Sequence, residues 1–432
     1  MKETLNAYLP KPTTRVALYA ALLSFLTYAS VYAFRKPFTV GTFEQEGHVF
    51  GIPYKDALVI AQALGYMISK FYGIRFIAEL GKFGRGNLII LLVTISWIAL
   101  LLFGITPAPW NIVFLFLNGF PLGIIWGILF SYIEGRKATD FIGAALAVSF
   151  IFSSGFVKTV AKWLWITFPI SEKWLPFATG ALFIIPLICF VKLLEKIPPP
   201  SEEDRLLRVE RSPMNKEERK VFFGKYAAGL VLLIFVYIVL TIFRDIRDNF
   251  AADIWKTLGY GSLPSVFSKT EIPITLMVLV LMGSMMLIKN NTRAFILTHY
   301  LIIVGFLIAG ISSMLFVMHL LNPIPWMTLV GLGLYMGYIP FNCLLFERLI
   351  AAFRQPGNIG FLMYLADSFG YLGSVVIIIA KTFMKNTNSW TYLYSNGVII
   401  FSVIGICATI AALIYFKKKL NLIPKNQQYA VN

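Results

Sequence analysis

Apolar runs of about twenty residues constrain this chain more than any other feature of its sequence. An α-helix needs about 20 such residues to cross a bilayer, and soluble domains do not contain these runs in series. The 432 residues are 58% hydrophobic and 14% charged. We therefore predict an all-α polytopic membrane protein with twelve transmembrane helices, at about residues 16–40, 57–78, 87–106, 110–133, 141–166, 174–194, 224–246, 270–288, 294–319, 325–350, 358–384 and 393–416.

One long charged segment divides the twelve runs into two groups of six. It reads "EKIPPPSEEDRLLRVERSPMNKEERK", and its three prolines and mixed charge are typical of a solvated linker. We therefore predict an N-terminal half over residues 1–194, a linker over 195–222, a C-terminal half over 223–418 and a tail over 419–432.

Basic residues gather on one side of the predicted helices. They precede the first run and follow the second, fourth, eighth, tenth and twelfth, whereas the loops after the third and ninth carry none. By the positive-inside rule, both termini and the linker are expected to be cytoplasmic, in a multi-pass protein of the plasma membrane (the cell inner membrane). The same bias accounts for the net charge of +17 without nucleic acid as a partner. We expect a monomer in the lipid bilayer.

Two sequence repeats relate the halves. "YASVYAFR" (28–35) and "YIVLTIFR" (237–244) both place a tyrosine seven residues before an arginine, and "GIIWG" (123–127) in the fourth run matches "GLYMG" (333–337) in the tenth. Six helices, a central cytoplasmic loop and six more helices are the plan of the major facilitator superfamily. We predict its two pseudo-symmetric halves, with the glycine pairs serving mainly in helix packing.

Several basic residues fall inside apolar runs, where a charge costs roughly 2.5–3.5 kcal/mol or more. Arg35, Lys70 and Arg244 are predicted to face a central cavity between the halves. Arginine is suited to bidentate recognition of phosphate or carboxylate, so the cavity is expected to bind an anion. Arg247 is the alternative to Arg244 as the inward residue.

The remaining charges have two interpretations each. Asp367 is the counter-ion of a cavity base or a proton carrier, and Lys158 has a coupling or counter-ion role or marks the outer half of its helix. Lys36 follows Arg35 about 100° further around a helix, so both cannot face one narrow site. We place Lys36 at the helix rim or in a structural salt bridge, and expect Lys36→Ala to be mild.

The sequence offers no support for catalysis or a bound metal. It contains no paired carboxylates or Ser/His/Asp set at usable positions, and its three histidines are far apart. The three cysteines lie in apolar runs without metal-ligand spacing: Cys189, Cys343 and Cys407. We expect neither an enzyme nor a cofactor.

Three motifs resemble those of the organophosphate:phosphate antiporter family, which includes glycerol-3-phosphate and hexose-phosphate transporters. They are "YASVYAFRKPF" (28–38), "GYMISKF" (65–71) and "SFGYLGS" (368–374). In that family the arginine of the first helix contacts phosphate, and tyrosines line the site. The resemblance implies substrate-binding roles for Tyr28, Tyr32, Arg35, Tyr66, Lys70, Arg244, Tyr338 and Tyr371.

The chain also departs from that family. The fifth run contains "VSFIFSSGF" (148–156), without the family's histidine, and "GKFGRG" (81–86) is a weakened gating motif. We therefore expect a secondary active transporter of a small phosphorylated or otherwise anionic organic solute, which exchanges it for inorganic phosphate by alternating access. The alternatives are a transporter-like membrane sensor of a phosphorylated ligand and a proton-coupled importer of another organic anion.

Overall fold

The structure is a computed structural model that describes residues 12–79, 84–133, 136, 139–199, 216–353, 359–383 and 389–422. Its N-terminal part contains the helices α2 (Pro12–Tyr32), α3 (Tyr54–Glu79), α4 (Arg85–Ile105), α5 (Ile112–Ile133), α6 (Thr139–Thr167) and α7 (Leu175–Glu195). Its C-terminal part contains α9 (Lys216–Asn249), α11 (Ser265–Met286), α12 (Asn291–Val317), α13 (Pro323–Cys343), α15 (Ile359–Phe383) and α16 (Trp390–Asn421).

Short elements connect these helices. They are η1 (Pro37–Val40), η2 (Glu44–Glu46), β1 (His48–Val49), β2 (Ile52–Pro53), α10 (Ala251–Thr257) and α14 (Leu345–Phe353). β1 and β2 form an antiparallel hairpin in which His48 faces Pro53. Within the described residues, ten helices are long and apolar enough to cross a membrane. The other two long helices, α3 and α15, contain Lys70 and Asp367.

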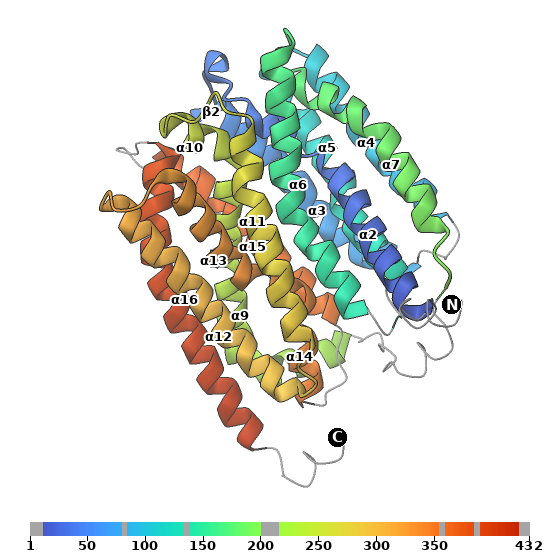
Figure 1. The fold of residues 1–432 in the computed structure, drawn as a ribbon, viewed down its shortest axis with the longest axis vertical. Coiled ribbons are helices and arrows are strands. Elements are labelled where there is room, and N and C mark those ends of the chain that lie inside the picture. The colour runs from blue at the N-terminus through green and yellow to red at the C-terminus, as the bar shows by residue number, and fades with distance from the viewer. Residues whose placement is uncertain are drawn as a thin grey trace, which may run out of the picture.

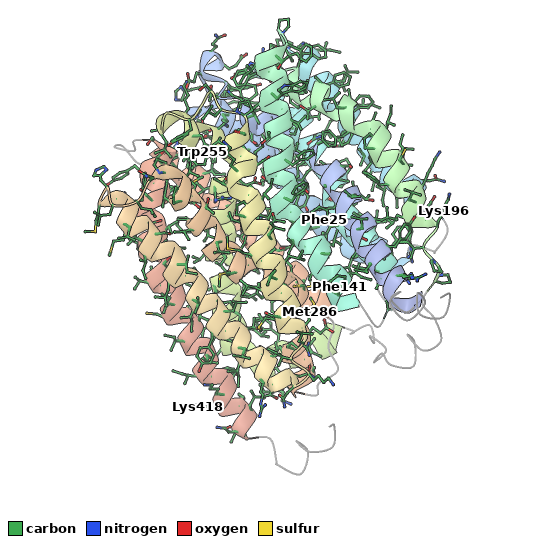
Figure 2. The ribbon with its side chains drawn as sticks, viewed as in Figure 1. Phe25, Phe141, Lys196, Trp255, Met286 and Lys418 are labelled. Carbon is green, nitrogen blue, oxygen red and sulfur yellow. The ribbon has the colours of Figure 1, made fainter. Side chains whose placement is uncertain are left out.

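The helices form two bundles that lie side by side (Figure 1). α6 packs along α11 and α3 packs along α15, so these four helices join the bundles. α2 begins and α16 ends toward one end of the molecule, which we call the terminal end; α10 and the hairpin lie at the other, which we call the hairpin end. In Figure 2, Lys418 lies toward the terminal end and Trp255 toward the hairpin end.

The first predicted run, over 16–40, is not one helix, which corrects the sequence prediction. α2 ends at Tyr32, whose carbonyl accepts the backbone N–H groups of both Arg35 and Lys36 at 3.0 Å. η1 then begins at Pro37, which has no N–H with which to continue a helix. Arg35 and Lys36 therefore lie in a turn, and the 100° relation expected for helical neighbours does not apply to them.

Where α2 ends, side-chain amides donate hydrogen bonds to backbone carbonyls that lack helical partners. Asn118 Nδ2 on α5 donates to the carbonyl of Phe34 at 2.9 Å, and Gln62 Nε2 on α3 donates to that of Arg35 at 2.9 Å. Gln62 also donates to Asn118 Oδ1 at 2.7 Å, and Asn118 Nδ2 lies 2.6 Å from Ser96 Oγ. Irregular backbone at membrane depth is stable only when protein groups replace the missing helical hydrogen bonds. This buried amide network therefore holds the turn that carries Arg35.

Glycines bring α3 and α5 into close contact. A Cβ at Gly119 would lie 2.3 Å from the carbonyl oxygen of Gln62, and one at Gly65 would lie 2.2 Å from that of Phe116. Gly123, in the first predicted glycine pair, lies against Tyr66 in the same way. These approaches agree with a packing role for the glycines and leave α3 little freedom to shift.

Three other boundaries differ from the sequence prediction. The run over 325–350 is divided at Leu344, where α13 ends and α14 begins. α9 begins at Lys216, inside the predicted linker over 195–222, and residues 200–215 of that linker lie outside the described residues. α16 continues into the predicted tail.

Replacing Asn118 with leucine tests the amide network. We expect Asn118→Leu to lower the unfolding free energy by roughly 2–4 kcal/mol, because each buried group that loses its partner costs about 1–3 kcal/mol. Chemical unfolding in mild detergent measures the change. Asn396→Leu is the matched control, because Asn396 is half-buried and donates an exposed hydrogen bond within its own helix, to the carbonyl of Tyr392. Equal losses in both variants would contradict the assigned role.

Candidate functional site

Arg35 lies against aromatic rings at the seam between the bundles. Its guanidinium carbon is 3.9 Å from the ring centroid of Tyr66 and 5.9 Å from that of Tyr32. Nε of Arg35 is buried without a hydrogen-bond partner, and Arg35 forms no ion pair with any described residue. Cation–π contact stabilises a guanidinium, but it leaves the N–H donors unused.

Arg244, in the second bundle, has a similar environment. Its guanidinium carbon is 4.1 Å from the ring centroid of Tyr338 and 5.9 Å from that of Tyr371. It also pairs with the adjacent Asp245 at 2.6 Å. The ring of Tyr371 lies 5.1 Å from the ring of Tyr66, the residue that faces Arg35. The two arginines therefore approach the same aromatic group from opposite bundles.

Six buried tyrosines make up that group, which we call the tyrosine cluster: Tyr28, Tyr32, Tyr66, Tyr237, Tyr338 and Tyr371. The ring of Tyr28 is 5.4 Å from that of Tyr32, and the ring of Tyr237 is 5.1 Å from that of Tyr338. The sequence analysis did not select Tyr237 as a site residue. It precedes Arg244 by seven residues, as Tyr28 precedes Arg35, so the internal repeat contained the signal needed to find it.

Lys70 and Asp367 form an ion pair that connects α3 to α15. The hydroxyl of Tyr237 donates to the other carboxylate oxygen of Asp367, and Asn342 Nδ2 lies 3.4 Å from that hydroxyl. The Lys70 ammonium is also 5.2 Å from the ring centroid of Tyr66. The geometry matches the counter-ion interpretation of Asp367 and places the pair beside the tyrosine cluster.

Arg247 lies elsewhere, inside the C-terminal bundle. It pairs with Glu271 on α11, and its Nη2 donates to the carbonyl of Met327 at 3.1 Å. Of the two arginines that the sequence left as alternatives, Arg244 is the one in contact with the tyrosine cluster.

Lys36 and Lys158 share one carboxylate, that of Asp248 on α9. Lys36 Nζ also donates to Asn249 Oδ1 at 2.7 Å, and its side chain is only 3% exposed. Lys36 is therefore in a structural salt bridge between the bundles and not at a helix rim. Because Lys36→Ala would remove one of the two cations that pair with a largely buried carboxylate, the expectation of a mild effect is withdrawn.

Further ion pairs join the bundles at the hairpin end. Lys55 pairs with Asp253, and its Nζ also donates to the carbonyl of Thr39 at 3.0 Å. The other two pairs are Lys256–Glu44 at 2.6 Å and Lys381–Asp56 at 3.7 Å. Together with the pairs at Asp248, they hold the two bundles in contact at this end of the molecule.

Solved transporter structures share this fold. A bacterial homologue of the human lysosomal transporter Spinster, in an inward-facing and unoccupied conformation, has a TM-score of 0.61 and 14% identity, covering 95% of this chain and 99% of its own. A bacterial homologue of the human drug peptide transporters PepT1 and PepT2 has a TM-score of 0.59 and 14% identity, with the same coverage. The nucleoside transporter NupG has a TM-score of 0.60 and 14% identity over 93% of this chain and 99% of its own.

These comparisons confirm the predicted fold class, an all-α polytopic membrane protein with the major facilitator fold. The chain belongs to the Family of unknown function (DUF5690), whose model matches residues 37–419. No curated protein matches the sequence. The resemblance to organophosphate:phosphate antiporters remains a prediction.

Substitutions at Lys70 and Asp367 test whether these two charges stabilise each other. Lys70→Met and Asp367→Leu should each lower the unfolding free energy by roughly 3–5 kcal/mol, because each removes the opposite charge from a buried ion pair. The double variant should recover most of that loss. Chemical unfolding in detergent measures all three.

Lys256→Met is the control for that experiment, because the Lys256–Glu44 pair is exposed and should contribute about 0–1 kcal/mol. A double variant no more stable than the single variants would show that Lys70 and Asp367 are not coupled.

Proposed function

We propose that the protein is a secondary transporter of a small organic anion bearing a phosphoryl group, exchanged for inorganic phosphate across the plasma membrane. The observation that carries this proposal is the convergence of Arg35 and Arg244, one from each bundle, on one tyrosine cluster. Arg35, Arg244, Lys70 and the tyrosines are the proposed substrate-binding residues.

The charges of the two arginines favour an anion between them. Asp245 partly neutralises Arg244, whereas Arg35 has no carboxylate partner among the described residues. Facing cations repel each other in a medium of low dielectric constant, and a bound anion removes that repulsion. Each guanidinium offers a planar fork that matches two oxygens of a phosphoryl group.

The tyrosines suit the rest of such a ligand. A phenol hydroxyl donates a hydrogen bond to a phosphate oxygen without adding charge, and its ring packs against an organic group. Because Tyr28, Tyr32 and Tyr66 come from the first bundle and Tyr237, Tyr338 and Tyr371 from the second, a ligand here would contact both bundles. The predicted division into halves at 1–194 and 223–418 is part of this proposal.

Transport then follows from rocking of the halves around the site, the usual mechanism of this architecture. The ion pairs at the hairpin end stabilise one arrangement, in which that end is closed. A bound anion neutralises the facing arginines and lets the halves close around it, whereas in an unoccupied site the repulsion between like charges keeps the arginines apart. Such coupling favours exchange over leak. We place the termini in the cytoplasm on the charge bias of the loops.

A second candidate function is proton-coupled import of an organic anion. It rests on Asp367, a buried carboxylate that accepts from Tyr237 and pairs with Lys70 across the seam. Buried carboxylates at such positions serve as proton carriers in many transporters.

Flux measurements in reconstituted vesicles separate these functions. Internal inorganic phosphate should accelerate entry of labelled phosphate, and then of phosphate esters, at a fixed pH on both sides. Entry driven by a pH gradient without internal phosphate would favour the proton-coupled candidate. Ligand binding without flux under either condition would favour a sensor.

Conservative arginine substitutions test the site itself. Arg35→Lys and Arg244→Lys keep the charge but lose the planar fork, so phosphate binding should weaken ten- to over a hundred-fold, from charge-assisted hydrogen bonds of roughly 1.5–3 kcal/mol each. Phosphate-induced thermal shift and phosphate exchange are the measurements. Arg293→Lys, at an exposed position on α12, is the matched control. Parental exchange by Arg35→Lys would overturn the assignment.

A further inference from the structure

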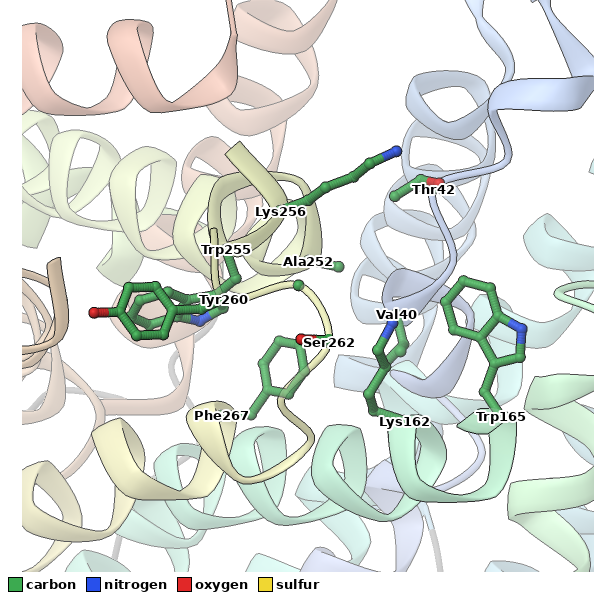
Figure 3. Close-up of a pocket in the computed structure, with 11 residues that line it drawn as sticks. Val40, Thr42, Lys162, Trp165, Ala252, Trp255, Lys256, Tyr260, Ser262 and Phe267 are labelled. Atoms are coloured by element: carbon green, nitrogen blue, oxygen red, sulfur yellow. The ribbon is translucent and has the colours of Figure 1, made fainter. Parts of the chain in front are cut away.

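A cavity of about 370 Å³ lies between the bundles at the hairpin end, apart from the tyrosine cluster (Figure 3). The first bundle contributes Val40 from η1 with Lys162 and Trp165 from α6. The second contributes Trp255 from α10 and Phe267 from α11. Its volume falls within the range of small-molecule sites, which is roughly 300–1,000 Å³.

Aromatic side chains form much of the cavity wall. Trp255 is 1% exposed and Phe267 5% exposed, so both are fixed by packing. Trp255 is further held by Tyr260, whose ring lies 5.6 Å away. In Figure 3, Lys162 rises from α6 between Phe267 and Trp165. Mostly apolar walls with a small number of polar or charged side chains are typical of sites that bind small organic ligands.

Lys162 is the basic side chain in the cavity wall that can bind an anionic group. Its ammonium lies 4.1 Å from the ring centroid of Trp165, and it forms no ion pair with the residues described here. Glu172 interacts with it electrostatically, but the Glu172 carboxylate already accepts the backbone N–H groups of Thr42 and Phe43, at 3.0 and 2.8 Å. The other lysine in the wall, Lys256, is paired with Glu44.

We propose that this cavity is a second ligand site, which binds a small organic anion with a flat apolar body, of the aryl carboxylate or aryl phosphate class. The anionic group binds the Lys162 ammonium, and the body packs between Trp165 and Phe267. The bound ligand holds the hairpin end closed.

A bound ligand stabilises the closed hairpin end because both bundles contribute to the cavity walls. Because η1 and α6 belong to one bundle and α10 and α11 to the other, the cavity keeps its shape only while the bundles touch at this end. A ligand that contacts both walls has a higher affinity for that arrangement and shifts the population toward it. The ligand is therefore a regulator of the conformational equilibrium, and this inference does not depend on what the tyrosine cluster binds.

Benzoate is the probe for the experiment, titrated by calorimetry into the full chain in lipid nanodiscs. Lys162→Gln should weaken benzoate binding at least tenfold, because it removes the charge at nearly constant volume. Ala252→Leu, which fills space at the cavity wall, should weaken it while keeping the charge. Lys269→Gln, at an exposed position on α11 away from the cavity, should leave the affinity unchanged.

Neutral benzyl alcohol tests the need for a charge, and inorganic phosphate tests the need for an aromatic body. Each should bind at least tenfold more weakly at this site than benzoate. Benzoate should also slow hydrogen exchange over residues 37–43 and 251–263, without affecting α14 at the terminal end.

Arg35→Lys distinguishes this site from the tyrosine cluster, because benzoate should bind that variant with parental affinity. Three results would overturn the proposal: no saturable benzoate binding, parental affinity in Lys162→Gln, or loss of binding in Arg35→Lys. None of these results bears on whether the chain exchanges phosphate.

Discussion

Polar groups within a hydrocarbon layer must find partners inside the protein, and this requirement organises the whole structure. Where α2 ends at Tyr32, amides from two other helices replace its missing hydrogen bonds, and the turn that they hold presents Arg35. Where lysines enter the bilayer, carboxylates from the opposite bundle meet them, as at Lys70 and Asp367. The buried pairs lie at the seam, so the interactions that pair the buried charges also hold the two bundles together.

Much of the fold could be predicted from the sequence because its signals are local. The length of the apolar runs, the side on which basic residues gather and the spacing of Tyr28 to Arg35 all lie within single segments. The break after Tyr32 depends on Asn118, which is 84 residues away from its acceptor at Phe34. No local pattern contains such a contact, and the apolar composition of residues 16–40 therefore predicts one helix where the structure has a helix and a turn.

The site shows the same division between local and distant information. Arg35, Arg244, Lys70 and the tyrosines of three motifs converge at the seam, although no pattern states which carboxylate each cation meets. Lys36 illustrates this point, because its carboxylate partner is Asp248, in the other bundle. Tyr237 differs from these cases, because the internal repeat alone predicts its place: it precedes Arg244 by the same seven residues by which Tyr28 precedes Arg35. Pseudo-symmetry is thus as informative about a binding surface as about helix count.

The distribution of charge across the seam also bears on how the chain is made. Lys36, Lys55, Lys70 and Lys158 belong to the first bundle, and their partners Asp248, Asp253 and Asp367 are synthesised much later. Each of these ion pairs therefore needs a carboxylate that is added to the chain only after the first six helices are complete. The stability that these pairs contribute is therefore absent from the first half alone and depends on both halves being present.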